Sequence, residues 1–184
     1  MHPVTTERLV LRPIDPVGDV DAVHAYASRA DVCRYIPWTP RTRAEVAAWL
    51  PGRSVTTIPA PGSAASLAIT LRETGELVGD LMLIWESAED RTAGLGYVIN
   101  PEHAGHGYAT EAARAMLAVA FDRLDLHRVV GHVDARNPAS AAVLRHLGMR
   151  QEAVLVENEW FKGSWSTMIT FAMLEREWRS LGTP

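Results

Sequence analysis

The chain has 184 residues, 47% of them hydrophobic, and a formal net charge of -4. The length and the hydrophobic share predict one globular domain over residues 1–184. The negative charge argues against a nucleic-acid partner, because phosphate binding needs a basic face. Cys33 is the single cysteine, which excludes an internal disulfide framework and a Cys-rich zinc site. No apolar run reaches the roughly 18 residues of a membrane span and no signal peptide opens the chain, so we expect a cytoplasmic protein with no membrane partner and no metal.

The first half of the chain reads as a strand, two helices and three further strands. Alternating apolar residues predict a strand over Arg8–Arg12. A helix is expected after Asp15-Pro16, and Thr42 with Glu45 three residues later predicts a capping box for a second, short helix. The prolines and glycines of Pro51–Ala65 mark a loop that is long enough to suspect a function, although a mobile excursion explains its length equally well. Further strands are predicted over Ser66–Arg72, Leu77–Trp85 and Leu95–Ile99.

The second half carries stronger helix signals. Apolar residues recur at helical spacing from Tyr108 to Leu124 and predict a long helix with one apolar stripe. Asn137 with Pro138 predicts the start of another helix, which Gly148 ends. Strands are predicted over Arg128–Val133, Met149–Val156 and Trp165–Leu174. A sheet with interleaved helices indicates an α/β or α+β fold.

The segment Asn100–Ala112 joins a predicted strand to the long helix. Backbone N–H groups at a helix start lie at the positive end of the helix dipole and favour an anion such as a pyrophosphate. Gly105 and Gly107 would let the backbone approach that anion closely. A tight strand-to-helix connection explains the same glycines equally well. Thr110 stands where a dinucleotide-binding fingerprint has its third glycine, which argues against a dinucleotide.

A second motif follows about thirty residues later, Asn137-Pro138-Ala139-Ser140, and taken alone it is explained as a helix cap and first turn. Together the two motifs, with Leu147-Gly148-Met149, resemble the GNAT acyl-CoA N-acyltransferase superfamily, and more specifically its RimJ/RimL-like branch of ribosomal-protein N-terminal acetyltransferases. Other segments that fit this resemblance are Thr6–Arg12, Tyr35–Trp38, Leu77–Gly79, Leu95–Tyr97 and Leu174–Trp178, so that it extends from about Thr6 to Trp178.

The resemblance implies a central mixed sheet, flanked by helices, that splays open between two adjacent parallel strands, with acyl-CoA in the resulting V. The backbone of Val98, Ile99 and Asn100 would pair with the pantetheine arm, with an N–H near Val98 facing the oxyanion. Asn137 would bond the pantetheine, and Ser140 would protonate the departing thiolate as the catalytic acid. The pyrophosphate would be held by the backbone N–H groups of Gly105, His106, Gly107, Tyr108, Ala109 and Thr110.

Two positions depart from the family pattern. Ala104 stands where the phosphate loop commonly begins with Gln or Arg, and Gly94 stands where a Glu often serves as the general base. Deprotonating an α-amine of pKa about 7.7–8.0 at pH 7 requires about 1–1.4 kcal/mol, whereas a lysine amine near 10.4 requires about 4.6 kcal/mol. The missing base therefore favours a weakly basic acceptor such as an α-amine. Substitute bases in the sequence are Glu86, Glu89, Asp90, Glu157 and Glu159.

Aromatic residues gather in the segments that flank the acceptor side in this family, and we expect Tyr35, Trp38, Trp85 and Trp160 to contact the acceptor. Lys162, the single lysine, lies between Trp160 and Trp165 on that side. Direct attack by the amine in a ternary complex needs no acyl-enzyme, so Cys33 is expected to be a packing residue.

The function that follows is an acetyl-CoA-dependent N-acetyltransferase acting on a primary amine, with a protein N-terminal α-amine favoured. A small-molecule amine, such as a polyamine, amino acid or aminoglycoside, is the first alternative acceptor. A non-catalytic acyl-CoA-binding sensor is the second alternative. A homodimer is possible for any of the three.

Overall fold

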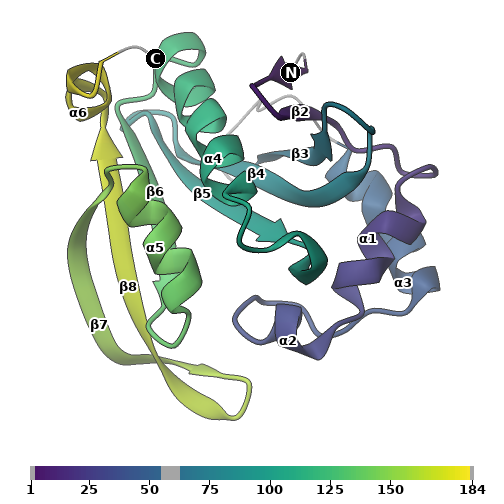
Figure 1. Cartoon of the computed structure of the whole chain (residues 1–184). Coiled ribbons are helices and arrows are strands. Elements are labelled where there is room, and N and C mark those ends of the chain that lie inside the picture. Colours follow the sequence, from purple (N-terminus) through teal and green to yellow (C-terminus); the bar gives the residue numbers. More distant parts are fainter. Residues whose placement is uncertain (1–2, 55–62, 183–184) are drawn as a thin grey trace.

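The computed structural model describes residues 3–54 and 63–182, and the strands among them form one eight-stranded mixed sheet in the order β1-β2-β3-β4-β5-β6-β8-β7 (Figure 1). The strands are β1 (Val4–Thr5), β2 (Leu9–Pro13), β3 (Ala64–Leu71), β4 (Leu77–Ser87), β5 (Thr92–Ile99), β6 (Arg128–Asp134), β7 (Arg150–Phe161) and β8 (Ser164–Leu174). Hairpins and meanders make most neighbours antiparallel, and within the described sheet β5 and β6 are the one parallel pair.

The parallel pair separates soon after it forms. β5 and β6 are in register only from Thr92↔Arg128 to Gly94↔Val130, although β5 continues to Ile99 and β6 to Asp134. On its other side β5 stays paired with β4 along its length. The sheet therefore opens into a V between β5 and β6, which confirms the predicted mixed, splayed sheet.

Helices cover both faces of the sheet, and strand alternation shows which face each one covers. Leu67 and Ile69 of β3 pack in a cluster with Ala112 and Met116 of the fourth helix, whereas Ala68 packs with Tyr26 of the first helix on the opposite face. The helices are α1 (Val20–Ala27), α2 (Ala30–Cys33), α3 (Arg43–Trp49), α4 (Tyr108–Ala118), α5 (Pro138–His146) and α6 (Glu175–Ser180), with short 3-10 turns at Leu50–Arg53 and Pro101–His103. None of the described helices is long and apolar enough to cross a membrane.

Local capping signals predicted several boundaries correctly. Thr42 caps α3 through a capping box, in which its Oγ1 accepts the Glu45 N–H at 3.3 Å and Glu45 Oε2 accepts the Thr42 N–H at 2.7 Å. Asn137 caps α5, and Gly148, with φ +83°, follows its last turn. Both caps satisfy backbone groups that a helix end leaves without a partner.

Other boundaries differ from the sequence prediction. The first helix begins at Val20 instead of directly after Pro16, because Asp19 accepts the Asp15 N–H at 2.8 Å and binds Arg12. The predicted helix to Leu124 ends as α4 at Ala118 and continues as a π turn over Val119–Arg123. β7 extends past the predicted Val156 to Phe161. Of the predicted loop at Pro51–Ala65, residues 55–62 lie outside the described residues.

Candidate active site

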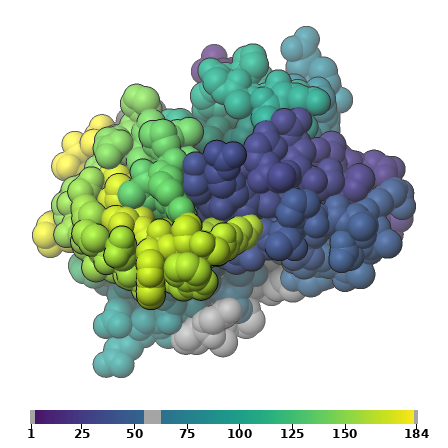
Figure 2. All heavy atoms as spheres, turned by 90° about the horizontal axis from the view of Figure 1, so that it is seen from below, coloured from purple at the N-terminus to yellow at the C-terminus, as the bar shows by residue number. Residues whose placement is uncertain are grey.

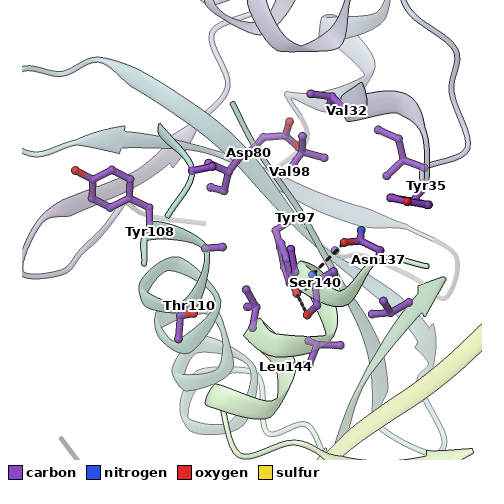
Figure 3. Close-up of a pocket in the computed structure, with 18 of the residues that line it drawn as sticks. Val32, Tyr35, Asp80, Tyr97, Val98, Tyr108, Thr110, Asn137, Ser140 and Leu144 are labelled. Atoms are coloured by element: carbon purple, nitrogen blue, oxygen red, sulfur yellow. Dashed lines mark hydrogen bonds between the residues drawn. The ribbon is translucent and has the colours of Figure 1, made fainter. Parts of the chain in front are cut away.

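A cavity of about 740 Å³ occupies the V between β5 and β6. Its walls come from β4, from the carboxyl half of β5, from the glycine-containing loop before α4, from the end of β6 and the start of α5, and from residues 31–38 around α2. Figure 3 shows Tyr97, Ser140 and Asn137 at its centre, with Thr110 on α4 and Tyr35 at opposite sides. Among the predicted site residues it brings together Tyr35, Trp38, Val98, Ile99, Gly105, Gly107, Tyr108, Ala109, Thr110, Asn137 and Ser140.

The strand edge that faces the V has free backbone groups. Val98 pairs with Asp80 of β4 on one side, whereas the β6 ladder on the other side stops at Gly94. Val98 and Ile99 therefore present one backbone edge to the cavity, which fits an extended amide-bearing chain such as pantetheine. Asn100 is placed differently: it is buried, its N–H donates to Val78 O at 2.8 Å, and its side chain caps the Glu102 N–H at 3.2 Å.

The loop before α4 has the geometry of an anion site. Gly105 and Gly107 adopt φ values of +82° and +79°, a left-handed conformation that side chains disfavour. The Glu111 N–H donates to Gly107 O at 3.0 Å, so the N–H groups of the preceding first-turn residues remain available as helix-start donors. These donors border the cavity and fit a phosphate group. His106 lies outside the cavity lining, where its ring stacks on Tyr108 with centroids 5.5 Å apart.

Glu111 ties this loop to the N-terminal strand. Its Oε1 accepts from the Thr6 hydroxyl at 2.6 Å and from the Arg8 N–H at 2.9 Å, and its Oε2 accepts from Arg8 Nε at 2.7 Å. A second guanidinium nitrogen of Arg8 donates to His106 O at 2.9 Å. The two motifs at residues 6–12 and 105–112 therefore form one contact that holds the phosphate-facing backbone in place. Nothing in the sequence alone indicated this pairing.

Ser140 lies at the bottom of the V with a partner that the sequence analysis missed. Its Oγ is 3.1 Å from Tyr97 Oη, and Tyr97 also donates to Ser140 O at 3.0 Å (Figure 3). Burial raises the pKa of Tyr97 to about 12, while the Ser140 contact opposes the shift. Asn137 Oδ1 accepts the Ser140 N–H at 3.1 Å, so the cap that starts α5 also orients Ser140. The site thus holds two neutral hydroxyl donors side by side.

The predicted acceptor residues divide into two pairs. Tyr35 and Trp38 line the cavity, and Trp38 packs on Trp49 with ring centroids 5.3 Å apart. Trp85 and Trp160 lie outside the lining. Trp85 is on β4 and packs in the core on the α4 face, whereas Trp160 is 60% exposed on β7.

Three carboxylates line the cavity, and each is paired with an arginine. Asp80 is buried, where it binds Arg53 at 2.5 Å and accepts from the Tyr26 hydroxyl at 2.6 Å, and burial raises the pKa of Tyr26. The Arg136 guanidinium lowers the pKa of Asp134 to about 2. The third pair joins Asp31 and Arg29 at 2.8 Å. The sequence analysis singled out none of these three carboxylates; a charged residue inside the apolar run Leu77–Ile84 was the available signal for Asp80.

A neighbouring side chain lies next to Gly94, the position where the family often has a glutamate. Gly94 is buried, and a Cβ added to it would lie 2.8 Å from Glu86 Oε1. Glu86 thus reaches from β4 into the space that a side chain at position 94 would enter. The other suggested bases, Glu89, Asp90, Glu157 and Glu159, lie outside the cavity lining, as does Glu86 itself.

Known proteins resemble this chain in sequence and in fold. A family model described as an acetyltransferase (GNAT) domain matches residues 8–150. The uncharacterized N-acetyltransferase YnaD of Bacillus subtilis is 30% identical over 183 residues, covering 97% of this chain and 99% of the relative. The crystal structure of a GNAT-family acetyltransferase from Bacillus anthracis has a TM-score of 0.86 at 28% identity, covering 95% of this chain and 99% of that one.

Two solved structures of lower identity share the fold. A spermidine N-acetyltransferase from Vibrio cholerae in complex with CoA and spermine has a TM-score of 0.80 at 22% identity, covering 95% of this chain and 99% of that one. RimL, a ribosomal-protein α-N acetyltransferase in complex with CoA, has a TM-score of 0.81 at 21% identity, covering 93% of this chain and 96% of that one. The family model spans most of this chain and the relative matches it almost throughout, so the chain belongs to the GNAT family and is an acetyl-CoA-dependent acyltransferase.

Proposed function

We propose that this acetyltransferase acts on the α-amine of a protein or peptide N-terminus, in the manner of the RimJ/RimL-like branch. The observation that carries this proposal is the charge pairing in the cavity: its three carboxylates are each bound to an arginine, so the described lining offers no unpaired carboxylate as a base. An α-amine needs only about 1–1.4 kcal/mol to lose its proton at pH 7, against about 4.6 kcal/mol for a lysine side chain.

The residues of the cavity would share the remaining work. Acetyl-CoA supplies an activated thioester when it is bound. The first-turn N–H groups of α4 would hold its phosphates, and the free edge at Val98 and Ile99 would orient its amide-bearing arm. Asn137 would border that arm while its Oδ1 keeps Ser140 in place. Ser140 Oγ would donate a proton toward the departing sulfur, and Tyr97 would orient the serine hydroxyl.

The proton of the amine would leave toward solvent-connected groups, with Glu86 the best placed of the five suggested carboxylates. Its Oε1 lies 2.8 Å from the place that the Cβ of a side chain at position 94 would take. A Glu86→Gln variant separates this role from simple solvent release. The expected result is a slower reaction below pH 8 with unchanged affinity for acetyl-CoA, and an unchanged pH profile would remove Glu86 from the mechanism.

The acceptor is tested with matched amines. The enzyme is incubated with acetyl-CoA and with peptides that carry a free N-terminus, the same peptides with a blocked N-terminus and an internal lysine, or small amines. Thiol release gives the rate, and mass spectrometry locates the acetyl group. The proposal expects kcat/KM to be highest for free N-termini and acetylation to be confined to the α-amine. Acetylation of the blocked, lysine-containing peptides at equal rates would contradict it.

A small cationic amine is the second candidate, and one observation favours it. The described lining of the cavity contains three aspartates and no lysine or arginine. The arginine partners of these aspartates lie outside that lining, and a cleft lined by one sign of charge attracts the opposite charge. If a polyamine has a kcat/KM above that of every peptide tested, this candidate replaces the N-terminal one. Succinyl-CoA belongs in the same assay, because nothing in the cavity fixes the length of the acyl group.

A further inference from the structure

Lys162 connects two parts of the molecule that the sheet leaves apart. It lies in the turn between β7 and β8, and its Nζ donates to Cys33 O at 2.5 Å and to Trp38 O at 2.6 Å. The ammonium also lies 5.3 Å from the centroid of the Phe161 ring. Figures 1 and 2 both show the tip of the β7–β8 hairpin beside α2.

The two carbonyls that Lys162 binds bracket a wall of the active-site cavity. Tyr35, Ile36 and Pro37 lie between them, and these residues line the cavity together with Trp38. The segment has no regular structure of its own, and the Ile36 N–H makes only a long 3.5 Å contact with Cys33 O. One side chain from residue 162 therefore fixes both ends of this wall.

The backbone at Lys162 indicates that the residue type matters for more than the turn. Phe161 pairs with Ser164, so Lys162 and Gly163 form a two-residue hairpin turn with φ values of +50° and +84°. Turns with two positive φ values favour Asn-Gly, and a lysine in the first position is disfavoured because of its Cβ. The chain thus holds its single lysine in a strained position, where the side chain reaches the α2 segment.

We propose that Lys162 is a positioning residue for the acceptor, because its ammonium clasps residues 33–38 and thereby fixes the Tyr35–Trp38 wall against which the substituent of the amine binds. This role rests on the proposed transfer to an amine in the cavity. The clasp joins the β7–β8 turn to the residues that follow α2, whereas the phosphate-facing loop precedes α4 and is not among the groups that Lys162 binds. The acceptor site should therefore depend on Lys162, and the acetyl-CoA site should not.

The chain contains an internal reporter for the clasp. Cys33 is its single cysteine, 1% exposed, and its carbonyl is one of the two that Lys162 binds. Burial raises the pKa of the Cys33 thiol, and the positive charge of Lys162 opposes that shift. Loss of the charge alone would slow thiol modification, because less thiolate would be present. Loosening of the segment would instead speed it, so the two effects have opposite signs.

The test uses Lys162→Asn, which suits the turn and removes the ammonium, with Arg176→Asn on α6 as a control that removes an exposed charge elsewhere. Modification of Cys33 by a chromogenic aryl disulfide is followed in the absence of substrates. We expect Cys33 to react at least about tenfold faster in Lys162→Asn than in the wild-type chain. In the Arg176→Asn control, the reaction rate should equal that of the wild-type chain. Equal or slower modification in Lys162→Asn would overturn the clasp, whether or not the enzyme turns over any amine.

Steady-state kinetics then test the positioning role separately. For the best acceptor of the amine panel, we expect KM for the acceptor to rise about fivefold to tenfold in Lys162→Asn, while KM for acetyl-CoA stays within twofold. Faster thiol modification with an unchanged acceptor KM would overturn the positioning role. An equal rise in both KM values would do the same. If the unmodified enzyme acetylates no amine at all, the proposed function fails, and the thiol measurement still decides the clasp.

Discussion

Removal of the Ser140 hydroxyl should slow transfer without unfolding the site. Ser140→Ala keeps the N–H that Asn137 accepts, and the substitution leaves Tyr97 with its bond to Ser140 O. A placed general acid contributes about 10²–10⁴-fold to a rate. The Tyr97 hydroxyl lies 3.1 Å from the Ser140 Oγ position and can donate a proton in place of the missing serine hydroxyl. We therefore expect the loss in kcat to fall at the low end of this range, about 10²-fold, or about 2.7 kcal/mol.

Tyr97→Phe provides the comparison within the same pair. It removes one hydroxyl from a buried ring, and a neutral hydrogen bond contributes about 1 kcal/mol, which corresponds to roughly a fivefold loss in kcat. The loss in the double variant should differ from the product of the two single losses, because each hydroxyl changes what the other contributes. Since the pKa of Tyr97 is about 12, the hydroxyl remains protonated across the accessible pH range.

The assay is thiol release at saturating acetyl-CoA and acceptor, from pH 6 to pH 10, together with binding of CoA by calorimetry. CoA affinity should change less than threefold in both single variants. If Ser140→Ala retains full turnover at every pH, the assignment of Ser140 as the proton donor is refuted. If the two substitutions combine multiplicatively, the two hydroxyls act independently and the pairing seen in the structure has no kinetic role.

Three further predictions follow from other parts of the molecule. Gly107→Val should weaken CoA binding at least tenfold by calorimetry, whereas Gly182→Val, with the same left-handed backbone at an exposed position after α6, should leave CoA affinity unchanged; equal losses would discredit the anion site. Asp134 and Glu152 have pKa values lowered to about 2 by arginine partners, so the stability that they contribute is present above pH 4.5 and is lost as pH falls toward 2; the urea midpoint should fall over that range, and less steeply in Asp134→Asn. The exposed apolar residues of the edge strand β7 predict a homodimer, so Val156→Lys should shift the sedimentation of a dimeric enzyme toward that of a monomer; an unmodified chain that sediments as a monomer at all concentrations would contradict this.

The parts of the fold that depend on local chemistry were predictable from the sequence. The cap at Thr42, the cap at Asn137 and the glycine after α5 each use residues within a few positions of one another, and the structure shows all three. The splay between β5 and β6 came from the family resemblance. Periodicity alone does not reveal it, because it depends on where the ladder between two distant segments stops.

The contacts that depend on strand parity or on distant segments could not be predicted. Trp85 and Met82 are an odd number of residues apart on β4, so their side chains point to opposite faces of the sheet. Trp85 faces the core under α4, whereas Met82 lines the cavity. Trp160 lies beyond a register shift between Leu155 and Glu159, which changes the pairing that simple alternation would give. The Tyr97–Ser140 contact joins residues 43 positions apart, and the sequence around either residue does not indicate its partner.

The way the sheet opens has a consequence for how such enzymes diverge. On the side proposed to hold acetyl-CoA, residues 98 to 110 would bind mainly through main-chain groups, and every amino acid except proline supplies both an N–H and a C=O once the strand and the helix start are in place. Substitutions there should be tolerated wherever the backbone geometry survives, which excludes the two left-handed positions, Gly105 and Gly107. The side proposed to hold the acceptor is built from side chains of residues 31–38, and the β7–β8 turn contacts that segment through Lys162. New amine specificities can therefore arise by exchange of a few residues on these segments while the use of acetyl-CoA is inherited unchanged.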